Sequence, residues 1–158
     1  MWFLVLWGLG IVTAGIQFLL NGVPGSTSEI CSVVLLHQFA VTFGIMGIIG
    51  IISNLVLADK NANMLGWPGG PFQIKYGFSQ LGIGVMGVMA IWFRGNFWAG
   101  VLVTIYVYAV SGLWTHTLEM IKNGKPDAMN VGNIIMCVTH QIMLTWLSIE
   151  AGGVWCFN

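Results

Sequence analysis

The stretch from Cys31 to Ala58 reads CSVVLLHQFAVTFGIMGIIGIISNLVLA and contains no Asp, Glu, Lys or Arg. A helix needs about 20 mostly apolar residues to cross the hydrocarbon core of a bilayer, which is about 30 Å thick. This stretch is long enough to cross the core and to tilt or extend past the headgroups. Because a backbone inside lipid must satisfy its own hydrogen bonds, we expect a membrane-spanning α-helix here.

The composition of the whole chain agrees with this interpretation. Of 158 residues, 6% are charged and 57% are hydrophobic, whereas a soluble domain carries about 25% charged residues. A mean hydropathy of +0.87 fits a surface covered by lipid. The formal net charge is zero, so no electrostatic field would attract nucleic acid, and we expect the bilayer instead as the chain's surroundings.

Polar breaks rich in Gly and Pro divide the chain into apolar stretches. The residues from Asp59 to Asn63 end the second stretch, and helix-breaking residues follow up to Pro71. Each stretch is too long and too uniformly apolar for a barrel strand. The sequence therefore predicts a single all-α domain, an integral membrane bundle of five transmembrane helices. Their predicted limits are about 2–20, 31–58, 73–93, 97–121 and 130–150.

The charges in the loops predict the orientation. With five spans, the N-terminus lies on the same side as the second and fourth loops. Lys60, Lys75, Lys122 and Lys125 fall on that side, and only Arg94 falls on the other. Because loops rich in Lys and Arg stay in the cytoplasm, we expect the N-terminus inside and the C-terminus outside. The expected location is a prokaryotic cytoplasmic membrane.

Glycines at helical spacing predict where the helices pack. Small residues three or four positions apart let two helix backbones approach closely. The simplest interpretation is packing within one bundle, and a homo-oligomer interface is compatible with it. The glycines concerned are Gly44, Gly47 and Gly50 in the second span and Gly82, Gly84 and Gly87 in the third.

Polar side chains within spans are the candidates for function, because they are costly in lipid. A haem held by two histidines needs them on different helices at one depth. Counting 1.5 Å per residue, the nearest pair, His37 and His140, differs by about 6 Å in depth. Hydrogen bonds to neighbouring helices are the simpler role, with a haem or quinone contact as the alternative. The candidates are His37, Gln80, His116, Glu119, His140 and Gln141.

One acid and one histidine share a helix face. Glu119 follows His116 by three positions, so both face the same side of the fourth span. The chain has no HExxH motif and no paired acids, so an interfacial hydrogen bond is the favoured role, a metal pair is the alternative, and no metal site is predicted.

The cysteines lack the CxxC spacing of a redox pair. Cys137 lies inside the fifth span, where it is expected to be an inert apolar residue. The predicted topology puts Cys31 and Cys156 at the same outer face. Since extracytoplasmic compartments permit disulfides, a bond between them is a candidate.

The region from Tyr76 to Trp146 contains motifs in an order that is found in a known family. Residues 77–87 read GFSQLGIGVMG, His116 follows near the end of the next helix, and Gly132-Asn133 opens the last. This order resembles an uncharacterised family of small bacterial and archaeal membrane proteins, distantly similar to the DoxX-like four-helix proteins. The resemblance implies a small helical bundle and, by analogy, quinone-coupled redox chemistry. Members tend to carry an acid in the last helix, where this chain has Thr139-His140-Gln141.

Three functions follow from these observations. The favoured one is a non-catalytic structural or accessory subunit that forms an oligomer or joins a larger membrane complex, because the glycine-rich faces come without a charged or metal-spaced site. The first alternative is a quinone- or haem-linked redox protein. The second is a pore or small-solute carrier, although the absence of charged residues from the middle of every span argues against ion-coupled transport.

Overall fold

The computed structural model describes residues 2–65, 69–122, 124, 126 and 128–156, so Lys125, one of the lysines that predict the orientation, lies outside the described residues. Throughout the described part, the regular elements are helices. The α-helices are α1 (Trp2–Asn21), α2 (Thr27–His37), α3 (Gly44–Ile51), α4 (Ala58–Leu65), α5 (Pro71–Met89), α6 (Asn96–Lys122) and α7 (Ala128–Ala151). Two π-helical segments, η1 (Gln38–Phe43) and η2 (Ile52–Val56), lie on either side of α3.

The central element is one continuous helix from Thr27 to Val56, formed by α2, η1, α3 and η2. Ser26 caps its start, where the Ser26 Oγ accepts a hydrogen bond from the Glu29 N–H at 3.3 Å. The wider turns of the two π segments hold buried polar side chains, namely Gln38 and Thr42 in η1 and Asn54 in η2. Such π segments are frequent at functional sites.

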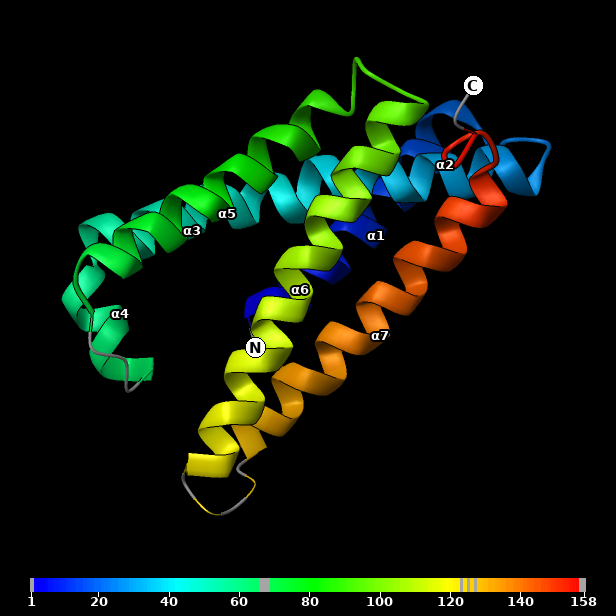
Figure 1. The fold of residues 1–158 in the computed structure, drawn as a ribbon. Coiled ribbons are helices and arrows are strands. Elements are labelled where there is room, and N and C mark those ends of the chain that lie inside the picture. Colours follow the sequence, from blue (N-terminus) through cyan, green and yellow to red (C-terminus); the bar gives the residue numbers. More distant parts are fainter. Residues whose placement is uncertain (1, 66–68, 123, 125, 127, 157–158) are drawn as a thin grey trace.

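The helices form two arms that diverge from a common end (Figure 1). The first arm consists of α3, η2, α4 and α5, and the second of α6 and α7. At the common end, the Ser28 Oγ donates to the Ala151 carbonyl at 2.6 Å, which joins the start of α2 to the end of α7. Phe3, near the start of α1, packs its ring 4.9 Å from the His140 ring of α7 and 6.2 Å from the Phe43 ring of η1.

The helices α3 and α5 pack through glycines. A Cβ built on Gly47 would lie 2.9 Å from the Cα of Gly84, so the two backbones are in direct contact. Gly87 of α5 meets the adjoining segment η1 at Phe43, and Gly44 and Gly50 of α3 lie in the same interface as Gly47. Gly82 does not, because it lies off the inner face of α5 and no atom comes within 4 Å of the Cβ position.

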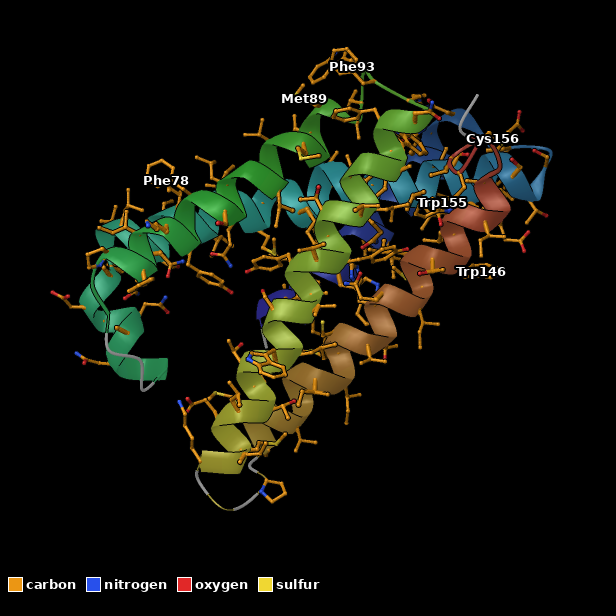
Figure 2. The ribbon with its side chains drawn as sticks, in the orientation of Figure 1. Phe78, Met89, Phe93, Trp146, Trp155 and Cys156 are labelled. Carbon is orange, nitrogen blue, oxygen red and sulfur yellow. The ribbon has the colours of Figure 1, made fainter. Side chains whose placement is uncertain are left out.

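Four described segments are long and apolar enough to cross a membrane. They are Phe3–Asn21, Thr27–Val56, Asn96–Lys122 and Ala128–Ala151. Outward-facing apolar side chains such as Phe78, Phe93 and Trp146 are compatible with lipid contact (Figure 2). The helix α5 is not among these four, and its sequence carries Gln73, Lys75 and Gln80.

The residues after the second predicted span depart from the prediction. The sequence predicts a loop from Asp59 onward, but Ala58–Leu65 is the helix α4. The continuous helix breaks at Leu57, where φ is −110° and ψ is 27°. Ala62 is buried, and the Gln73 Nε2 donates to the Ala58 carbonyl at 2.8 Å. These contacts hold α4 against the start of α5.

Candidate functional site

A pocket of about 340 Å³ lies between the two arms, and we call it the wedge pocket. Apolar side chains from α1, the central helix, α6 and α7 form much of its wall. Among the described residues that line it, none is Asp, Glu, Lys or Arg. The polar side chains that line it are Ser53, Asn54, Asn61, Tyr76, Gln80, Tyr108, Thr115, His116, Asn133 and Gln141.

A chain of hydrogen bonds crosses the wedge pocket from one arm to the other. The Asn61 Nδ2 donates to the Asn54 Oδ1 at 3.1 Å, and the Asn54 Nδ2 donates to the Gln80 Oε1 at 3.0 Å. The Gln80 Nε2 donates to the Tyr108 hydroxyl at 2.7 Å, which donates to the Tyr76 hydroxyl at 2.6 Å. Tyr108 of α6 is thus tied to α5 by two polar contacts.

The position of Gln80 depends on Gly50. A Cβ built on Gly50 would lie 2.8 Å from the Gln80 Cδ, so the side chain of Gln80 fits only because that Cβ is missing. The Asn54 Nδ2 also donates to the Gly50 carbonyl at 2.8 Å, which fixes the amide that meets Gln80. The glycine interface between α3 and α5 therefore positions the polar contacts of the pocket.

Three side chains that line the wedge pocket form no side-chain hydrogen bond within the described part of the chain. They are Ser53 of η2 and Asn133 and Gln141 of α7, and the Gln141 Oε1 is buried. Polar groups away from water normally find a partner. The pocket therefore presents uncharged donors and acceptors that the described protein atoms leave unsatisfied.

His116 of α6 lines the wedge pocket and contacts α7 through one ring nitrogen. Its Nδ1 lies 2.6 Å from the Asn130 Oδ1 of α7. Because an amide oxygen only accepts, the proton belongs on Nδ1, and in the neutral ring Nε2 then carries a lone pair.

The other two histidines lie in different surroundings. His37 contacts α1 with both ring nitrogens, the Nδ1 at 2.9 Å from the Thr13 Oγ1 and the Nε2 at 2.7 Å from the Gln17 Oε1. His37 therefore joins α2 to α1 and does not line the wedge pocket. A haem ligated by His37 would have to break one of these contacts.

His140 is fully buried among aromatic rings. The Phe3, Trp7 and Phe43 rings lie 4.9, 5.2 and 5.6 Å from its ring. Its Nε2 lies 3.2 Å from the Gln38 Oε1 of η1, and its Nδ1 has no hydrogen-bond partner in the described structure. His140 therefore joins α7 to the π segment of the central helix.

Glu119, Cys31 and Cys156 do not line the wedge pocket, whereas Cys137 does. Glu119 pairs with Lys122 at 3.0 Å, while His116 pairs with Asn130. The described residues hold no group of three or more His, Cys, Asp or Glu placed to bind a metal. Cys31 is a buried free thiol and Cys156 an exposed one. The segments that carry them meet at the common end, and a disulfide between them stays a prediction.

Of the lining residues, the sequence singles out Gln80, His116 and Gln141, but it does not indicate the hydrogen-bond network around Gln80. Asn54 has a signal, because an amide within an apolar span is costly unless it is paired. Tyr76 and Tyr108 have none, because tyrosines are ordinary in membrane helices near an interface. Tyr76 and Tyr108 meet because of the angle between α5 and α6.

Comparison with known proteins adds a family to this description. No curated protein and no solved structure matches the chain. A link to the DoxX-like proteins is not found, so the redox analogy keeps no support beyond the resemblance. Residues 1–152 match DUF6790, a family of unknown function, and the chain is a member of that family.

Proposed function

We propose that this chain is a membrane-embedded binding protein or carrier that holds an uncharged small molecule in the wedge pocket. The observation that carries the proposal is the group of unsatisfied polar side chains, Ser53, Asn133 and Gln141, that line a pocket between apolar helices. A volume of about 340 Å³ falls within the range typical of small-molecule sites.

The lining defines the charge of the ligand. A charged group in this pocket would find no opposite charge among the described lining residues, and an unpaired charge is strongly disfavoured away from water. A lipid tail alone is also a poor occupant, because it would leave amides and a hydroxyl facing hydrocarbon. An uncharged molecule with hydrogen-bonding groups satisfies both conditions.

The proposal includes five spans. The helix α5 runs antiparallel along α3, since Gly47 meets Gly84 and Gly50 meets Gln80. This alignment supports α5 as a fifth crossing at the depth of the central helix, with Gln73, Tyr76 and Gln80 turned inward and Lys75 exposed near its start. The free ends of the arms carry Lys60, Lys75 and Lys122, which supports a cytoplasmic position for these ends in a prokaryotic membrane, with the C-terminus outside.

Two glycines of α6 provide a matched test. Gly112 lines the wedge pocket and Gly100 does not, and no atom comes within 4 Å of a Cβ at either position. Gly112→Phe should fill the pocket, and Gly100→Phe should place the same ring on the outer surface. Native mass spectrometry of gently extracted protein should show a small-molecule adduct on the wild type and on Gly100→Phe. The adduct should be lost from Gly112→Phe, and an adduct on all three proteins or on none contradicts the proposal.

A second candidate is the structural or accessory subunit that the sequence favours. The divergence of the two arms is the observation in its favour, because a transmembrane helix of another chain would complete the bundle (Figure 1). Five of the six predicted packing glycines, all except Gly82, pack against a neighbouring helix of the same chain, so they no longer motivate self-association. A larger assembly on gentle extraction, broken by Gly112→Phe, supports this candidate. A monomer that carries a small adduct contradicts it.

A further inference from the structure

Resting on the proposed function, we propose that the ligand of the wedge pocket is an uncharged lipid whose head carries hydroxyl groups. One hydroxyl donates to the His116 Nε2, and the head also contacts Ser53 and Asn133. The hydrocarbon chain lies against the apolar part of the wall. This assigns a chemical class to a pocket whose charge alone permits many neutral ligands.

The contact between His116 and Asn130 determines which ring nitrogen of His116 can accept a hydrogen bond from a ligand. Its Nδ1 is committed as a donor to the Asn130 Oδ1 at 2.6 Å, which leaves Nε2 as an acceptor in the neutral ring. His116 lines the wedge pocket. A ligand that satisfies this nitrogen must supply a donor, which a hydroxyl does and a plain ester does not.

Two further polar side chains of the wedge pocket can both donate and accept hydrogen bonds. Ser53 and Asn133 line the pocket from opposite arms and form no side-chain hydrogen bond in the described part of the chain. A serine hydroxyl and an asparagine amide each donate and accept. A head with two or more hydroxyls matches this mixture, because each hydroxyl also donates and accepts.

Part of the wall of the wedge pocket is apolar. Leu6, Phe43, Met46, Ile105 and Met136 line the same pocket. These side chains come from α1, η1, α3, α6 and α7, and they offer hydrocarbon contact beside the polar groups. A molecule that fills both parts is amphipathic, and a lipid reaches such a site from the bilayer.

The test compares two lipids with the same acyl chain. Monooleoylglycerol carries two free hydroxyls, and methyl oleate carries none. Tritiated monooleoylglycerol is bound to the full-length protein in nanodiscs and displaced by either unlabelled lipid. We expect saturable binding in which monooleoylglycerol displaces the label at a concentration about tenfold lower than methyl oleate does, because hydrogen bonds at the head distinguish the two.

Variants of the lining residues test whether the preference for monooleoylglycerol over methyl oleate arises in the wedge pocket. His116→Phe should abolish most of it. Since this change also removes the contact with Asn130, Ser53→Ala and Asn133→Leu give an independent reading, and each should weaken monooleoylglycerol binding severalfold. Thr104→Val is the control, because the Thr104 Oγ1 donates only to the Gly100 carbonyl of its own helix at 2.9 Å.

The outcomes separate this inference from the proposed function. Equal displacement by the two lipids, blocked by Gly112→Phe, overturns the hydroxyl assignment and leaves a binding pocket. No saturable binding of either lipid also overturns the assignment, and the native adduct on the wild type then decides the proposed function by itself. A preference that survives in both Ser53→Ala and Asn133→Leu contradicts the placement of the head.

Discussion

Gly47 of α3 and Gly84 of α5 lie in direct backbone contact, each at a distance where a Cβ on one would lie 2.9 Å from the Cα of the other. The same antiparallel alignment brings Gly50 under Gln80 and Gly77 against Asn54. Close packing of this interface therefore determines where the amides of the wedge pocket lie. The contacts between α3 and α5 therefore contribute to the stability of the fold and also position the side chains of the pocket.

A substitution in this interface should destabilise the fold. Gly84→Ala adds a methyl group where a Cβ would meet the Gly47 Cα and the Phe43 carbonyl at 2.9 and 3.0 Å. Overpacking of this kind costs about 1–3 kcal/mol. Thermal unfolding in detergent should show a lower midpoint for Gly84→Ala. The control is Gly82→Ala on the outer face of α5, and a midpoint lowered equally by both variants would refute the interface.

The bridge between the arms should depend on one hydroxyl. Tyr108→Phe removes the group that accepts from the Gln80 Nε2 and donates to the Tyr76 hydroxyl. The expected loss is about 1 kcal/mol, the size of a hydrogen bond between membrane helices. Tyr106→Phe is the matched control on the same helix, since the Tyr106 hydroxyl contacts Thr145 of α7 on an exposed face.

Spin labels would report this bridge directly. Phe78 on α5 and Trp146 on α7 are exposed side chains on different arms (Figure 2). In a cysteine-free background, labels at these two positions should give a broader distance distribution in Tyr108→Phe than in Tyr106→Phe. Identical distributions in both variants would show that the hydroxyl does not hold the arms.

His37 should be energetically coupled to Gln17. The two side chains lie 2.7 Å apart and join α2 to α1. A double-mutant cycle with His37→Leu and Gln17→Leu should give a coupling energy of about 0.5–1.5 kcal/mol. The comparison cycle pairs His37→Leu with Ser79→Ala, because the Ser79 Oγ donates only to the Lys75 carbonyl of its own helix at 3.0 Å. Additivity in both cycles would contradict the contact.

Cys156 tests the orientation of the chain. It is exposed near the C-terminus, whereas Cys31 is buried. With the C-terminus outside, a membrane-impermeant maleimide should label Cys156 on intact cells after mild reduction. Less labelling before reduction is expected from the predicted bond with Cys31. Labelling that appears only after the membrane is permeabilised would reverse the topology.

The helical character and the close-packing glycines could be predicted because each depends on a local pattern. An apolar run such as Cys31–Ala58 determines its own backbone hydrogen bonds in lipid. Gly44 and Gly47 are three positions apart, which places them near one helix face. Gly82 does not pack against another helix, because it lies two positions from Gly84 and therefore faces the outer surface of α5.

The wedge pocket could not be predicted because it depends on contacts between distant segments. Tyr108 and Gln80 meet only through the angle at which α6 leaves α5, and Asn54 reaches Gln80 from a π segment that no spacing rule indicates. The same limit explains His140, whose aromatic surroundings come from α1 and η1. Depth counted along single helices gives no information on which neighbour a side chain faces.

Photolabelling would show whether an uncharged amphipathic molecule occupies the wedge pocket. A neutral lipid with a diazirine near its head is crosslinked to the protein in a bilayer, and the labelled residues are mapped by mass spectrometry. We expect labels at lining residues such as Met136 and Cys137, and these labels should be lost in Gly112→Phe and kept in Gly100→Phe. Labels spread over the outer faces of the helices, with the same pattern in both variants, would contradict it.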